Sequence, residues 1–173
     1  MSVSKVKYLI GISVYTMISV LLILLQSTGL MTLRIYTASA VLVVPLTVYA
    51  GFYFGEYCAA AFGFLVGAAT DTYSSTLLYN TVFLTLLGFT AGLFMSRFFN
   101  RNIAAAAVVN ASASAIYFFL KWLFIYAFSD PASIFVLTRF SLPSFLYTAI
   151  LGGVMFFVLN PILKKIPLRP KNN

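Results

Sequence analysis

The chain has 173 residues, of which 62% are hydrophobic and 8% charged, with a mean hydropathy of +1.01. A typical globular domain has about 45–50% apolar and about 25% charged residues, so three acidic and eleven basic residues cannot supply a soluble surface. The composition excludes an ordinary soluble domain and predicts an integral membrane protein. The chain has no histidine and one cysteine, which excludes an internal disulfide and most enzymatic and metal-binding chemistry.

Six apolar segments follow one another along the chain, separated by polar and turn-forming residues. A helix needs about 20 mostly apolar residues to cross a hydrocarbon core of about 30 Å. Continuous apolar runs such as residues 20–25 lack the alternation of barrel strands. We therefore expect an all-α membrane protein, a bundle of six transmembrane helices in a single domain over residues 1–173. The expected spans are about 8–25, 36–54, 57–72, 81–98, 103–128 and 142–162.

The first segment follows a basic start, as a signal peptide does, but about 18 apolar residues are long for one and no convincing cleavage site follows. We expect a retained first helix. Six spans place both termini on one side, which we expect to be cytoplasmic because basic residues gather there. These bases flank the spans and form no patch, so we expect contact with anionic lipids and no binding of nucleic acid. They are Lys5, Lys7, Arg97, Arg101, Lys164, Lys165, Arg169 and Lys171.

Small residues recur on one face of the third span, at a strict spacing of four that ends at Asp71. Gly63 and Gly67 belong to this stripe, and Gly88 and Gly92 repeat the spacing in the fourth span. In lipid no hydrophobic gain drives helices together, so small residues that permit close backbone approach mark helix contacts. Two interpretations stand: a face for the helix of another protein, or packing of spans three and four against each other.

Polar residues form a second stripe on the fifth span: Asn110, Ser114, Tyr117 and Lys121 share one face. Counting about 1.5 Å per residue places Lys121 about 27 Å above the cytoplasmic end of the span, at a depth similar to that of Asp71. An amine at membrane depth nearly always faces protein or trapped water. We expect Asp71 and Lys121 to form an ion pair or to line one outward-facing polar pocket. The alternative is that Lys121 extends to the membrane surface by itself.

The sequence lacks the groups that membrane enzymes need. Without histidine no serine nucleophile has its usual base, and the only acids are Glu56, Asp71 and Asp130, of which Asp130 falls in a loop. No phosphate-binding glycine motif occurs. Glu56 could meet Arg97 or Arg101 as a loop tether. We therefore expect no catalytic residue, no metal and no cofactor, and a protein that acts by binding.

Two motifs resemble those of the rod shape-determining protein MreD family. Leu25-Gln26-Ser27-Thr28 is similar to the family pattern L-Q-S-[ST], and Gly63-Phe64 with Gly67 and Asp71 is similar to G-F-x-x-G-x-x-x-D. Residues 84–92 also resemble the following span of that family. The chain departs from the pattern just before Asp71, where the family often has Gly-Leu-Leu-x-Asp, and in the next loop.

The resemblance implies a non-catalytic scaffold subunit of the cell-elongation (Rod) complex in the bacterial inner membrane, which supports rod shape and peptidoglycan synthesis. It implies binding to an MreC-like single-span membrane protein, and through it to MreB filaments, RodA and a penicillin-binding transpeptidase. The residues carried over have packing and orienting roles. They are Gly63, Phe64, Gly67, Asp71, Gln26 and Ser27, of which the last two could instead cap the end of the first helix.

A different class of protein has the same size and number of helices: the substrate-binding S component of an energy-coupling-factor vitamin transporter. Such a protein would gather polar side chains around a ligand near the outer face. Its first span usually carries an Ala-x-x-x-Ala step, which residues 11–15 lack. A tightly bound vitamin would favour this alternative, and co-purification with a single-span coiled-coil protein would favour the scaffold. The side chains that could surround such a ligand are Asp71, Lys121, Asn110 and Trp122.

Overall fold

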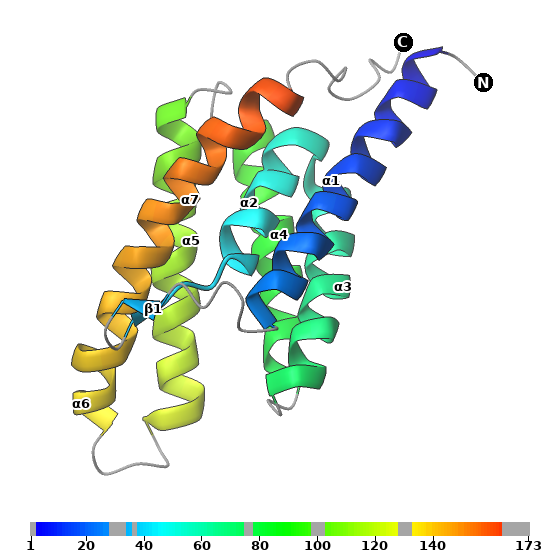
Figure 1. Cartoon of the computed structure of the whole chain (residues 1–173). Helices are drawn as coiled ribbons and strands as arrows, with labels where there is room; N and C mark the ends of the chain where they lie inside the picture. Colours follow the sequence, from blue (N-terminus) through cyan, green and yellow to red (C-terminus); the bar gives the residue numbers. More distant parts are fainter. Residues whose placement is uncertain are drawn as a thin grey trace.

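The computed structural model describes residues 3–27, 34–35, 38–74, 78–97, 103–127 and 133–163, and this part of the chain is almost entirely helical. Successive long helices run in alternating directions, so that the start of α1 and the end of α7 lie at the same end of the bundle (Figure 1). The helices are α1 (Val3–Ser27), α2 (Val43–Phe54), α3 (Glu56–Ser74), α4 (Tyr79–Arg97), α5 (Ile103–Lys121), α6 (Ser133–Val136) and α7 (Leu142–Leu163), with π-helical turns η1 (Trp122–Tyr126) and η2 (Leu137–Ser141).

Helix α2 is the central element of the bundle. All of its twelve residues are buried, and it contacts α1, α3, α4, α5 and α7. Tyrosine hydroxyls form hydrogen bonds between α2 and its neighbours. The Tyr15 hydroxyl of α1 donates to the Leu46 carbonyl, and the Tyr49 hydroxyl of α2 donates to the Gly152 carbonyl of α7 at 2.7 Å. Twelve residues make a rod of about 18 Å, which is shorter than the hydrocarbon core of a bilayer.

The expected helix over residues 36–54 is wrong in its first half. Arg34–Ile35 (β1) and Ala38–Ser39 (β2) pair as a two-residue antiparallel ladder, and α2 begins only at Val43. Pro45 sits in the first turn, where its missing N–H costs no helical hydrogen bond. The backbone N–H groups just upstream bind hydroxyls of α7 instead: Ser39 binds Ser144 at 3.2 Å, and Val41 binds Thr148 at 3.0 Å.

The remaining expected spans agree with helices, with shifted ends. Helix α3 covers the expected 57–72, α4 covers nearly all of 81–98, and α5 with η1 reaches residue 126 of the expected 103–128. Helix α7 begins at the expected Leu142, and the short α6 and η2, which the sequence did not indicate, precede it. Two helical stretches, Ala104–Tyr126 and Ile134–Pro161, are long and apolar enough to cross a membrane, judged by length and composition alone.

Gly55 makes the sharp junction between α2 and α3. Its φ of 90° is a conformation that a residue with a Cβ adopts only under strain. The junction lets α3 run back along α2, and α4 then returns beside α3, so that α2, α3 and α4 form one closely packed unit (Figure 1).

Candidate functional site: the α3–α4 hairpin and the α4–α5 groove

Asp71, near the end of α3, caps the beginning of α4. Its Oδ1 accepts hydrogen bonds from the backbone N (3.0 Å) and Nδ2 (2.9 Å) of Asn80, and its Oδ2 accepts from the backbone N (2.8 Å) and Oγ1 (2.7 Å) of Thr81. The first N–H groups of a helix have no partner within the helix, and negative charge is favourable at this end. The carboxylate therefore does for α4 what a capping side chain does, from the preceding helix.

Asn80 connects this cap to α5. The Tyr117 hydroxyl donates to Asn80 Oδ1 at 2.5 Å, and the Tyr79 hydroxyl donates to the Tyr117 carbonyl at 3.0 Å. Asn80 and Tyr117 are both 2% exposed. We call Asp71, Asn80, Thr81 and Tyr117 the Asp71 network. It joins α3, α4 and α5 at the end of the bundle opposite the start of α1 (Figure 1).

The expected ion pair between Asp71 and Lys121 stays a prediction. Lys121 lies one turn beyond Tyr117 on α5 and is half-buried, so it lies at the same end of the bundle as Asp71. The four hydrogen bonds to α4 engage both carboxylate oxygens of Asp71.

The rest of the polar stripe on α5 faces the interior of the bundle. Asn110 is 1% exposed and Ser114 is fully buried. Asn110 Nδ2 donates to the Ala149 carbonyl of α7 at 3.3 Å. Asn110 lies eleven residues, or about 16 Å, from Lys121 along the same helix, so it belongs to the α5–α7 contact and not to the Asp71 network.

The glycine stripe of α3 packs against α4 within the chain. A Cβ at Gly63 would lie 2.2 Å from the Leu84 carbonyl oxygen, and one at Gly67 would lie 2.6 Å from the Asn80 carbonyl oxygen. Both contacts are with backbone, which has little room to give. These glycines therefore bring two helix backbones into direct contact, and a partner's helix would need another surface.

The glycines of α4 are used in the same way. A Cβ at Gly88 would lie 2.4 Å from the Ala59 carbonyl oxygen of α3, and one at Gly92 would lie 2.6 Å from the Glu56 Cα. Gly51 of α2 also abuts Gly92, since its added Cβ would lie 2.8 Å from the Gly92 nitrogen. Three helices thus meet along glycine backbones.

Phe64 behaves differently from the glycines of its motif. Its side chain is 53% exposed, and its neighbour Leu65 is 63% exposed. Tyr57, nearer the start of α3, is 76% exposed. The side of α3 away from α4 carries a set of residues that repeat at helical spacing. They are residues 57, 61, 64, 65, 68 and 72. We call Tyr57, Phe64 and Leu65 the outer face of α3.

Gln26 joins the end of α1 to the entry of α2. Its Nε2 donates to the Ala40 carbonyl at 2.5 Å, and its Oε1 accepts from the Leu42 backbone N at 3.3 Å. This contact fixes the chain segment that enters α2, and a role of Gln26 in partner binding stays a prediction. The side chain of Ser27 lies outside the described residues.

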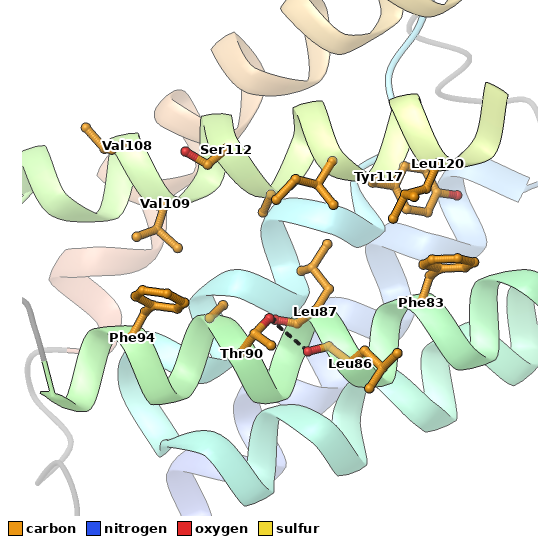
Figure 2. Close-up of a pocket in the computed structure, with 13 residues that line it drawn as sticks. Phe83, Leu86, Leu87, Thr90, Phe94, Val108, Val109, Ser112, Tyr117 and Leu120 are labelled. Atoms are coloured by element: carbon orange, nitrogen blue, oxygen red, sulfur yellow. Dashed lines mark hydrogen bonds between the residues drawn. The ribbon is translucent and has the colours of Figure 1, made fainter. Parts of the chain in front are cut away.

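An apolar groove separates α4 from α5, as Figure 2 shows. It has a volume of about 580 Å³. The Thr90 hydroxyl in it bonds to the Leu86 carbonyl of its own helix at 2.9 Å, so it offers little to a polar ligand. The lining residues from α4 include Phe83, Leu86 and Phe94, and those from α5 include Val108, Ser112 and Leu120.

Sequence reasoning did not anticipate the groove or the role of Asn80. Asn80 and Thr81 lie inside the first turn of α4 and donate to Asp71, so they are not the usual N-cap signal, in which a side chain just before the helix accepts. Asp71 itself is nine residues before Asn80, across a turn. Of the other expected residues, Arg97 is exposed and Glu56 is half-buried, whereas Arg101 and Asp130 lie outside the described part of the chain. Within that part, no group of three or more His, Cys, Asp or Glu residues could hold a metal ion.

No protein-family model matches the chain, and neither a curated protein nor a solved structure matches it. The family expectation therefore depends on the motifs of the sequence and on how the structure uses their residues.

Proposed function

We propose that this chain is a multi-pass protein of the bacterial cytoplasmic membrane that acts as a non-catalytic scaffold of the cell-elongation machinery, as the MreD resemblance implies. In this proposal α1, α3, α4, α5 and α7 cross the bilayer, α2 with the extended segment before it makes the sixth crossing inside the bundle, and both termini lie in the cytoplasm. It binds a single-span, MreC-like partner and through it MreB filaments, RodA and a penicillin-binding transpeptidase.

The distribution of apolar side chains supports the placement in a membrane. Large hydrophobic residues are exposed along the outward sides of α1, α4, α5 and α7, including Met17 (77%), Phe157 (67%) and Ile150 (66%). A soluble monomer rarely exposes contiguous apolar area on this scale. Two of the helical stretches also meet the length and hydropathy of a membrane span.

The use of the polar groups supports a binding role. The hydroxyl, amide and carboxylate groups described above join helices to one another: Asp71 to α4, Gln26 to the entry of α2, and Asn110 to α7. Such ties give a rigid bundle, and rigid elements present a docking surface accurately. A scaffold needs such a surface and no reacting group.

The observation that carries the proposal is that the residues of the Gly-Phe-x-x-Gly-x-x-x-Asp motif have two different roles. Gly63, Gly67 and Asp71 lock α3 to α4, while Phe64 points away from that contact and is 53% exposed. A motif of this kind builds a stiff hairpin and presents one large apolar side chain on it. We place the contact with the partner's single helix on the outer face of α3.

Detergent co-purification with the single-span coiled-coil partner tests the proposal. We expect the unaltered chain to retain the partner and Phe64→Ala to retain about tenfold less, since the ring's close contacts with the partner's helix, each worth about 0.1–0.2 kcal/mol, are lost. Phe157→Ala is the matched control, because it removes the same side chain from an exposed site on α7. We expect it to bind normally.

Depletion of the chain in cells should cause loss of rod shape, and Phe64→Ala should fail to restore it while Phe157→Ala succeeds. Equal partner binding by both variants would move the contact away from α3. A purified chain that retains no such partner and carries a vitamin would contradict the scaffold and favour the S component.

A further inference from the structure

The α4–α5 groove is long, narrow and apolar. Along α4 it extends from Phe83 to Phe94, eleven residues or about 17 Å, and Figure 2 shows these two rings at its opposite ends. Its volume of about 580 Å³ lies within the range of about 300–1,000 Å³ that is usual for bound small molecules.

A basic residue follows the residues that line one end of the groove, one turn further along α4. Arg97 is the last residue of α4 and is exposed. It lies three residues after Phe94 and seven after Thr90, so at helical spacing all three share one side of α4. The end of α4, where Arg97 lies, is at the end of the bundle where α1 begins (Figure 1).

We propose that the groove holds an acyl chain of an anionic phospholipid from the cytoplasmic leaflet, with the phosphate headgroup on Arg97. The inference rests on the membrane placement proposed above and not on the identity of the protein partner. A basic residue near the headgroup layer favours anionic over zwitterionic lipid by about fivefold. An apolar channel continuing inward from that residue lets the rest of the lipid follow the protein surface.

Charge favours an anionic lipid over a partner's helix in the groove. A transmembrane helix is apolar along its length and brings no negative charge to Arg97, whereas the phosphate of an anionic lipid does.

A tryptophan placed in the groove reports on the bound lipid. Trp122 is the only tryptophan of the chain, so Trp122→Phe gives a background without tryptophan fluorescence. In it, Phe94→Trp is the groove reporter and Phe157→Trp, an exposed site on α7, is the matched control. Each full-length variant is reconstituted in phosphatidylcholine vesicles containing an equal minor fraction of brominated phosphatidylglycerol or brominated phosphatidylcholine.

We expect brominated phosphatidylglycerol to quench the fluorescence of the groove reporter about fivefold more effectively than brominated phosphatidylcholine does. The two lipids should quench the control equally. Arg97→Gln should remove this preference, while Arg139→Gln, which removes one exposed base from the opposite end of the bundle, should leave it. Ser112→Phe should block quenching at the groove reporter. Ala115→Phe, on the same helix but outside the groove lining, should not.

Equal quenching of the groove reporter by the two lipids, or a preference that survives Arg97→Gln, would overturn the inference and leave the membrane placement intact. Selective loss of quenching at the groove when the single-span partner is added would assign the groove to that partner's helix and would also overturn it. An absence of quenching at both reporters would contradict the membrane placement itself.

Discussion

The two faces of α4 differ in how they meet their neighbours. Toward α3 and α2, Gly88 and Gly92 allow backbone to touch backbone, and the added Cβ atoms would lie 2.4 and 2.6 Å from neighbouring main-chain atoms. Toward α5, the bulky Phe83, Leu86 and Phe94 hold the helices apart around a groove of about 580 Å³. Both neighbours follow or precede α4 across a short connection, so closeness in the chain does not explain the difference.

The difference between these two faces indicates which features make helices pack closely when water is absent. In lipid, apolar side chains gain nothing by leaving the solvent, so close approach and hydrogen bonds decide which faces pack. The α3–α4 contact has both, in its glycines and in the four bonds of Asp71. The α4–α5 contact has two described polar ties, from Tyr117 to Asn80 and from Tyr79 to the Tyr117 carbonyl, both at one end.

The largest predicted effect is at the glycine contact. Gly63→Ala places a Cβ 2.2 Å from the Leu84 carbonyl oxygen and 2.7 Å from its carbon, which forces the two helices apart. We expect a loss of about 3 kcal/mol in the free energy of unfolding, at the upper end of the cost of overpacking. Thermal unfolding of the purified protein in detergent measures it.

Gly153→Ala on α7 is the matched control, since nothing lies within 4 Å of a Cβ added there. We expect no measurable change. A Gly63→Ala variant as stable as Gly153→Ala would show that the α3–α4 backbones do not touch as described.

The second prediction concerns the cap. Asp71→Asn removes the charge that faces the first turn of α4 and replaces one acceptor oxygen by a donor. We expect it to cost about 1.5–3 kcal/mol, the usual value of hydrogen bonds to a charged group. Lys121→Gln distinguishes cap from ion pair. If the cap dominates, this change costs clearly less than Asp71→Asn, whereas equal costs that are not additive in the double variant would establish the ion pair.

The third prediction isolates one of the two hydrogen bonds between α4 and α5, and leaves the bond from Tyr79 to the Tyr117 carbonyl in place. Tyr117→Phe keeps the ring at the groove and removes the hydroxyl that donates to Asn80 Oδ1. We expect a loss of about 1 kcal/mol in the free energy of unfolding. Tyr57→Phe, at a tyrosine that is 76% exposed, serves as control and should be neutral. A neutral Tyr117→Phe would show that the Asp71 network ends at α4.

The order of the helices and most of their ends were predictable, because turn-forming residues interrupt the apolar runs at the right places. The segment before α2 was not. Residues 38–42 carry no breaker of a helix. The Ser39 and Val41 N–H groups instead bind Ser144 and Thr148, more than 100 positions later. Local composition carries no signal of such a distant contact.

The candidate site was predictable to a similar degree. The spacing of Gly63 and Gly67 indicates a close helix contact, but the sequence leaves open whether the contact lies within the chain or with a partner. The sequence indicates that Asp71, at the end of the glycine stripe, needs a partner. That its partners are Asn80 and Thr81 depends on the conformation of the turn between α3 and α4. The groove depends on the separation of α4 and α5, which follows from the three-dimensional packing of many side chains at once.

The smallest predicted effect is the change in the free energy of unfolding when a groove residue is enlarged. The size of that change distinguishes a groove filled by lipid from an empty one. Ser112→Leu adds apolar atoms to the groove, each gaining about 0.1–0.2 kcal/mol per close contact. If an acyl chain already fills that space, the leucine replaces contacts that lipid was making, and the free energy of unfolding in lipid vesicles should change by less than about 0.5 kcal/mol. An empty groove would instead gain from being filled, so stabilisation well beyond that of the matched Ala115→Leu would mean that nothing occupies it. A neutral result, together with the selective quenching at Phe94→Trp, would establish that the loosely packed face of α4 is completed by the membrane.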